Sequence, residues 1–240
     1  MLLRSVLAWV LIAGVATPLR AAPRPLAPPG VAASAFPAPD RPVADVISPI
    51  WDSETARDRT SEVGTVARHL GLGTGSSVAD IGAGSGYYAV RLAKLVGPEG
   101  RVYAQDITPS YLTGLERRVR RERLQNVTVS LGDPHDPRLP AGSLDAAVLV
   151  HMYHEVGQPY GLLYNLVPAL KPGGRVGIVD VDAATGQHGT PPALLTCELA
   201  AVGYREVARH DLGRSGYLAV FEPPTLRPAP ETLRACRERP

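Results

Sequence analysis

The segment VADIGAGSG, at residues 78–86, decides the fold of this chain. It joins a short apolar strand, expected at residues 77–81, to a helix, expected at about residues 86–96, through a glycine-rich turn. Glycine lets the backbone turn sharply and approach a ligand, and the free N–H groups at a helix start favour a carboxylate or a phosphate. A strand that enters a helix through such a turn predicts an α/β sheet with a ligand at this point.

The spacing of the glycines separates two classes of ligand. Gly82, Gly84 and Gly86 follow the pattern GxGxG. A dinucleotide-binding turn needs a further glycine at the sixth position, where this chain has Tyr87. The spacing therefore argues against NAD and against a nucleotide-dependent oxidoreductase.

The rest of the chain alternates strands and helices. Further strands are expected at residues 101–105, 127–131, 144–150, 175–181, 204–210 and 217–222, with helices at about 61–71, from 108 onward, 158–170 and 192–202. This order predicts a doubly wound, mostly parallel seven-stranded sheet with helices on both faces. Ligands of such sheets bind beyond the carboxyl ends of the strands, at the switch point beside the first strand. The glycine turn lies at that place.

Four motifs in sequence order resemble the class I S-adenosylmethionine (SAM)-dependent methyltransferases. They are residues 78–86, Asp106 after the second strand, Gly132-Asp133 after the third, and LKPGGR at residues 170–175. The resemblance covers about residues 61–222. It implies a Rossmann-like methyltransferase fold, S-adenosyl-L-methionine as the cofactor, and methyl transfer to an acceptor by in-line displacement.

The resemblance also implies the cofactor side of the site. The residues that it places at the methionyl end of SAM belong to or border the glycine turn; they are Asp80, Gly82, Gly84, Gly86 and Tyr87. It implies that Asp106 holds both ribose hydroxyls, which suits a carboxylate because that group can accept two hydrogen bonds at once. It implies that Asp133 contacts the adenine amine.

The segment HMYHE, at residues 151–155, follows the fourth strand, where many relatives hold acceptor-side residues. We expect His154 to be the catalytic base or a group that positions the acceptor, because an imidazole can take a proton near neutral pH. We expect His151 to contact SAM or the substrate, and structural hydrogen bonding is the alternative for both. The sequence predicts no metal site, since only His188 lies in a loop that could join these histidines and Glu155.

The methyl acceptor is left open by the sequence. Leu139-Pro140 and Ser143-Leu144-Asp145 resemble the group that includes the ubiquinone and menaquinone C-methyltransferases. GSGYYA, at residues 84–89, is also similar to the protein isoaspartyl methyltransferases, which we rank second. A non-catalytic SAM-binding or interaction module is the remaining alternative. We expect a small-molecule acceptor ahead of a protein.

Composition limits the choice of partner. The chain has 240 residues, a formal net charge of +2 and 45% hydrophobic residues. This content builds the core of one domain, which we place at residues 50–222. The low net charge gives no global basic field, so no nucleic-acid partner is expected.

Both ends of the chain differ in composition from the domain. Residues 1–22 predict a signal peptide or a membrane anchor, because Arg4 precedes an apolar run at residues 6–13 that is short for a transmembrane helix. We expect export to the periplasm or anchoring at the inner membrane, with a cytoplasmic location as the alternative. Membrane contact is expected only through this segment. Residues 23–49 predict a Pro/Ala-rich linker, and residues 223–240 a disordered tail.

The two cysteines, Cys197 and Cys236, are too few and too far apart in sequence to form a metal-binding pair. They could bridge in an oxidising compartment. Because Cys236 lies in the predicted tail, we expect two unpaired thiols.

Overall fold

The computed structural model describes residues 22–46 and 53–238, and its centre is a seven-stranded sheet. The strands are β1 (Ser77–Ile81), β2 (Arg101–Asp106), β3 (Val127–Leu131), β4 (Leu144–Val150), β5 (Leu170–Asp180), β6 (Arg205–Asp211) and β7 (Tyr217–Glu222). Their order across the sheet is β3-β2-β1-β4-β5-β7-β6. Strands β1 to β5 pair in parallel, and β7 is antiparallel to β5 and β6. The predicted fold class is confirmed.

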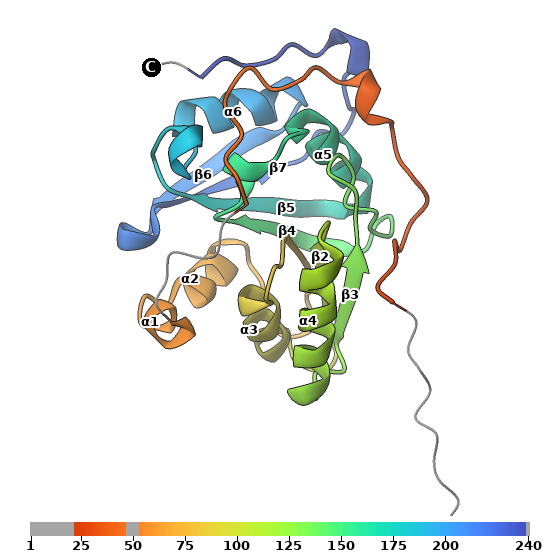
Figure 1. Cartoon of the computed structure of the whole chain (residues 1–240), viewed down its shortest axis with the longest axis vertical. Helices are drawn as coiled ribbons and strands as arrows, with labels where there is room; N and C mark the ends of the chain where they lie inside the picture. Colours follow the sequence, from red (N-terminus) through yellow and green to blue (C-terminus); the bar gives the residue numbers. More distant parts are fainter. Residues whose placement is uncertain (1–21, 47–52, 239–240) are drawn as a thin grey trace, which may run out of the picture.

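Helices cover both faces of the sheet (Figure 1). Helices α1 (Glu54–Asp58), α2 (Glu62–His69), α3 (Tyr87–Val96) and α4 (Pro109–Arg121) lie on one side, and α5 (Pro159–Leu166) and α6 (Pro192–Ala201) on the other. Side chains that alternate along the strands pack into two hydrophobic cores, one on each face of the sheet. Val78 and Val148 pack with α2, α3 and α4, whereas Ala79 and Leu149 pack with α5 and α6. This alternation buries the central strands on both faces.

Two elements differ from their predicted bounds by more than two residues at one end. The helix expected at residues 158–170 ends at Leu166, and a 3₁₀ turn at Val167–Ala169 follows it, because Pro168 has no N–H for the helical ladder. Strand β5 begins at Leu170 because that residue pairs with Leu144 before a register shift. The LKPGGR motif therefore lies within β5, at this irregularity.

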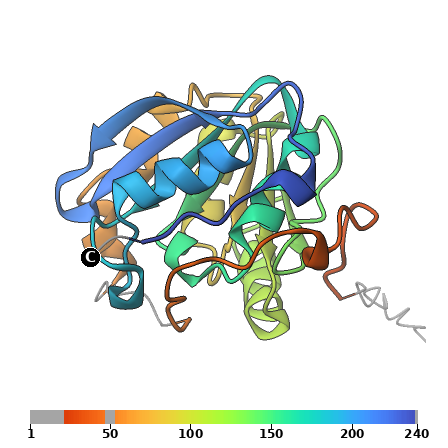
Figure 2. The ribbon, with the colours of Figure 1, turned by 90° about the horizontal axis from the view of Figure 1, so that it is seen from above.

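The predicted linker and tail lie along the domain in the described residues (Figure 2). Residues 22–46, which we call the strap, cross the side of the sheet that carries α5 and α6, and Phe36 is buried there against Tyr164. Residues 223–238, the C-terminal arm, follow the same side and bury Leu233. The prediction of a disordered tail is therefore wrong for residues 223–238, because buried side chains anchor them.

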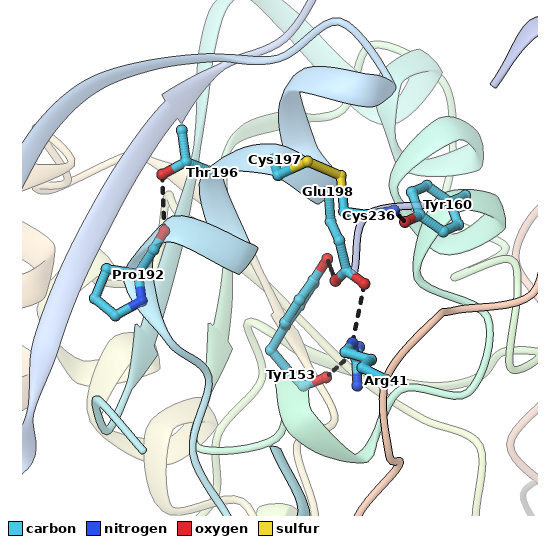
Figure 3. Close-up of a disulfide and its surroundings, with 8 residues drawn as sticks. All are labelled: Arg41, Tyr153, Tyr160, Pro192, Thr196, Cys197, Glu198 and Cys236. Atoms are coloured by element: carbon cyan, nitrogen blue, oxygen red, sulfur yellow. Dashed lines mark hydrogen bonds and ion pairs between the residues drawn. A yellow bond between two sulfur atoms is a disulfide. The ribbon is translucent and has the colours of Figure 1, made fainter. Parts of the chain in front are cut away.

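Helix α6 joins the strap and the arm (Figure 3). Arg41 donates from Nε to Glu198 Oε1 at 2.9 Å, and both side chains are fully buried. The neighbouring Cys197 forms a disulfide with Cys236, with the two Cα atoms 6.0 Å apart. The expectation of two unpaired thiols is wrong, because the ordered arm brings Cys236 within bonding reach of the helix.

The predicted signal peptide or anchor, residues 1–22, lies outside the described residues except for its last residue. Within the described ranges, no helix is both long enough and apolar enough to cross a membrane. Membrane contact through the N-terminal segment stays a prediction.

Loss of the Cys197–Cys236 disulfide is expected to lower the free energy of unfolding by roughly 3–4 kcal/mol, because the bond closes a long loop in the unfolded chain. Urea denaturation of the oxidised protein, the reduced protein and the Cys197→Ser/Cys236→Ser variant measures this effect. The reduced protein is the matched control, since it keeps both sulfur atoms. Equal unfolding free energies for the oxidised and reduced forms would contradict a stabilising cross-link.

Candidate active site

The glycine turn leaves the carboxyl end of β1 and enters α3 at Tyr87. Gly82, Gly84 and Gly86 have φ angles of 72°, 51° and 85°, which glycine adopts without the strain of a side chain. A Cβ on Gly86 would collide with the Leu115 side chain, whereas one on Gly84 would meet no atom within 4 Å. Gly84 therefore presents open backbone at the edge of the sheet where ligands bind.

Asp106 ties this turn to the end of β2. Its Oδ2 accepts a hydrogen bond from the Gly84 N–H at 2.9 Å, and its Oδ1 accepts one from the Thr108 N–H at 2.8 Å. Each carboxylate oxygen keeps a second lone pair, so two further donors can be accepted. This arrangement fits the predicted contact with a pair of neighbouring hydroxyls.

Asp80 is buried on β1 below the turn. Burial raises the pKa of Asp80 to about 7, and the nearby charge of Asp106 adds to the rise. The hydrogen bond from the Ala89 N–H lowers this pKa, but by less than burial raises it. Its Oδ2 has no hydrogen-bond partner among the described residues. A cationic ligand group would offset the cost of ionising such a carboxylate.

Asp133 follows β3 on a tight loop, closed by backbone hydrogen bonds with Asp136 at 2.8 and 3.0 Å. Its side chain forms an ion pair with Arg138 at 2.7 Å. The strap passes here, where the Gly30 N–H donates to the buried Asp136 carboxylate at 2.7 Å. The sequence gives no hint of Asp136, because its partner lies in the predicted linker. The contact of Asp133 with an adenine amine stays a prediction.

Tyr87 points towards α1. Its hydroxyl donates to Asp58 Oδ1 at 2.8 Å, and its ring centre lies 3.8 Å from the guanidinium of Arg91 and 4.2 Å from that of Arg57. Burial and the hydrogen bond to Asp58 raise the pKa of Tyr87. The sequence predicts no α1, so these partners are not foreseen by it. The contact of Tyr87 with SAM stays a prediction.

His151 connects the end of β4 to α2. It has a φ of 51°, and its Nε2 lies 3.2 Å from Glu62 Oε2. Glu62 also pairs with Arg57 and accepts a hydrogen bond from the Tyr88 hydroxyl, each at 2.8 Å. Burial alone would raise the pKa of Glu62, but the His151 hydrogen bond and the Arg57 charge outweigh it and lower that pKa to about 2. A contact of His151 with SAM or substrate stays a prediction.

His154 is buried on the 3₁₀ turn Tyr153–Glu155 that follows β4. Its Nδ1 lies 3.0 and 3.1 Å from the two carboxylate oxygens of Asp180, at the end of β5. Asp180 also accepts a hydrogen bond from the Thr190 hydroxyl at 2.6 Å. With Asp180 ionised, this network assigns the imidazole proton to Nδ1 and leaves the Nε2 lone pair for another partner.

Two residues that support His154 are not singled out by the sequence. Asp180 has a recognisable signal, because it is an acidic residue at the carboxyl end of an apolar strand. Arg41 has none, because it lies in the predicted linker. Its guanidinium donates to the backbone oxygens of Tyr153 and Val156, each at 3.3 Å, and so holds the turn that carries His154.

Known proteins share the central part of this chain. A family model described as "Methyltransferase domain" matches residues 78–174. A protein-L-isoaspartate O-methyltransferase from Methanothrix thermoacetophila is 32% identical over 107 residues, which are 45% of this chain and 48% of the relative. The ubiquinone/menaquinone biosynthesis C-methyltransferase UbiE from Pseudomonas fluorescens is 29% identical over 116 residues, which are 48% of this chain and 45% of the relative. The chain spans about half the length of these curated relatives.

A solved structure shares the fold. The SAM-dependent methyltransferase from Aquifex aeolicus has a TM-score of 0.61 and 24% identity, with 67% of this chain and 87% of that chain covered. Its likeness extends beyond the segment that the family model matches. Residues 78–174 therefore match a methyltransferase domain, and the chain shares the fold of the Aquifex aeolicus protein.

Proposed function

We propose that this chain is an enzyme that transfers the methyl group of SAM to an acceptor. The observation that carries the proposal is the glycine turn tied to Asp106 within the matched domain. The residues present fit SAM. Gly84 faces open space, Asp106 can accept from two ribose hydroxyls, and Asp80 offers the α-ammonium group an oxygen that has no partner among the described residues.

SAM supplies an electrophilic methyl group on a sulfonium that leaves readily. The protein must hold the acceptor atom in line with the breaking C–S bond and exclude water. Asp106 would hold the ribose and Asp80 the methionyl part of SAM, and Asp133 would hold the adenine amine. Tyr87 and His151 would border the methionyl end, and their contacts with α1 and α2 fix their side chains.

We assign His154 to the acceptor side as the catalytic group. Its Nε2 takes the proton of an acceptor that starts protonated. Asp180 is a positioning residue, because it orients the ring through Nδ1 and stabilises the imidazolium formed after proton transfer.

The proposed acceptor is a small molecule. The isoaspartyl alternative rests on residues 84–89 and on the relative named above, which matches less than half of this chain, and it is not favoured. The second alternative is a SAM-binding module without catalysis. Proposed export or membrane anchoring gains support from the Cys197–Cys236 disulfide, because such bonds persist in oxidising compartments. An exported enzyme would need SAM delivered across the membrane.

Asp106→Asn is expected to weaken SAM binding by roughly 1.5–3 kcal/mol, about 10- to 150-fold in Kd, because charge-assisted hydrogen bonds are lost. Calorimetric titration of the full chain measures Kd. Asp145→Asn is the matched control, since Asp145 also accepts a backbone N–H, from Ser77 at 2.7 Å, at the opposite edge of the sheet. An unchanged Kd in Asp106→Asn, or an equal loss in both variants, would count against the assigned site.

SAM binding is expected to strengthen as pH rises through about 7, the value to which burial raises the pKa of Asp80. Below this pH the carboxyl is protonated and neutral, and above it the carboxylate can pair with the SAM ammonium. The measurement is Kd between roughly pH 6 and 8, around the neutral range in which this carboxyl titrates. Asp80→Asn should flatten the profile. A flat wild-type profile would rule out Asp80 as the counter-charge.

Methyl transfer is tested with radiolabelled SAM and a cell extract as the source of acceptor. The wild-type chain should label a product, and His154→Ala should label less of it while its Kd for SAM is unchanged. Equal loss of binding and labelling in His154→Ala would make this residue structural. SAM binding without any labelled product by the wild type would favour the non-catalytic module.

A further inference from the structure

We infer that His154, Glu155 and His188 form a binding site for a divalent transition-metal ion. One ligand atom from each residue can be chosen so that all three lie within 4.8 Å of one another. His154 and Glu155 come from the turn after β4, and His188 comes from the loop after β5. The site lies on the proposed acceptor side, but it does not depend on methyl transfer. The sequence predicts no metal site, because it does not reveal that these two loops meet.

Asp180 orients His154 as the outer partner of a metal ligand does. A metal-binding histidine usually donates its second ring N–H to a carboxylate, which fixes the tautomer and makes the free nitrogen more basic. Here Nδ1 of His154 faces the Asp180 carboxylate at 3.0 Å. Asp180 itself is held by the Thr190 hydroxyl at 2.6 Å and the Val181 N–H at 2.9 Å.

The spacing between the first two ligand atoms suits an ion between them. His154 Nε2 lies 3.9 Å from Glu155 Oε1, which is too long for a hydrogen bond. Zinc binds nitrogen and carboxylate oxygen at about 2.0–2.2 Å. An ion can therefore bind both atoms after a small rotation of either side chain.

His188 supplies the third ligand. Its ring meets the His154 ring edge-on, with ring centres 5.6 Å apart. Its Nδ1 is shielded from solvent and has no hydrogen-bond partner among the described residues. The backbone of His188 has a φ of 57°, which is uncommon outside glycine. Because an unpartnered buried nitrogen is costly, a ligand of His188 would offset that cost.

Two imidazoles and one carboxylate form the donor set of open zinc sites, where the fourth position takes water or substrate. In this chain the open position would bind the acceptor atom and lower its pKa. His154 would then act as a metal ligand, and the ion would assist loss of the acceptor proton. The two roles of His154 can be distinguished by experiment, because the metal site requires His188, whereas a general base does not.

Calorimetric titration of the metal-free full chain with Zn²⁺ is expected to show one tight site. His188→Ala and Glu155→Gln should each weaken binding by more than the ~10–100-fold typical of losing an outer partner. The matched control is His210→Ala, which removes one ring of the His69–His210 stack elsewhere in the fold and should leave the Zn²⁺ affinity unchanged. Co²⁺ in place of Zn²⁺ should give an intense visible absorption that His188→Ala abolishes.

The proposal is overturned if the chain takes up no Zn²⁺, if His188→Ala binds it as well as the wild type, or if His210→Ala loses it equally. Circular dichroism checks the fold of each variant, and the conservative Glu155→Gln decides the question if His188→Ala misfolds. Zn²⁺ binding is measured without SAM. A failure to bind Zn²⁺ would therefore overturn the metal site without contradicting the proposed methyl transfer.

Discussion

The hydrogen bond from the Gly84 N–H to the Asp106 carboxylate fixes the ligand edge of the sheet. It joins the turn after β1 to the end of β2, the neighbouring parallel strand. Parallel strands end at a common edge, so the ends of β4 and β5 bring His154 and Asp180 to the same side of the molecule. The proposed cofactor side and the proposed acceptor side therefore both follow from the common direction of the parallel strands.

The ends of the chain support the proposed acceptor side from outside the sheet. Burial raises the pKa of Glu198, and the charge of Arg41 opposes that rise. A buried ion pair adds little net stability, but loss of one partner leaves an uncompensated charge that costs about 3–5 kcal/mol. The pair therefore fixes the strap against α6. Through its bonds to Tyr153 and Val156, Arg41 then holds the turn that carries His154.

Local patterns were enough to predict most of the sheet and to name candidate residues for the cofactor side. Apolar runs and glycines are contiguous signals, so β1, its turn and α3 follow directly from residues 78–86. Asp80 and Asp106 became candidates because they belong to the motifs that resemble the methyltransferases. His154 became a candidate because it follows β4, but its partner Asp180 comes from a different strand. The contact between His154 and Asp180 forms only when β4 and β5 lie side by side, so no local pattern reveals it.

Long-range contacts explain what the sequence did not reveal. The strap and the arm have no helical or strand periodicity, and their order comes from contacts such as Arg41 with Glu198. The Cys197–Cys236 bond requires that the arm already lies on α6. Helix α1 has five residues, too few for a periodic pattern, so the partners of Tyr87 were not foreseen.

The central claim is that the carboxyl ends of β1 and β2 hold SAM. A crystal structure of the full chain grown with S-adenosylhomocysteine, the product left after methyl transfer, tests it most directly. We expect density for the ligand along the glycine turn, with both ribose hydroxyls within hydrogen-bonding distance of Asp106 and the amino group beside Asp80. Ligand density elsewhere, or none at the turn at saturating concentration, would contradict the claim.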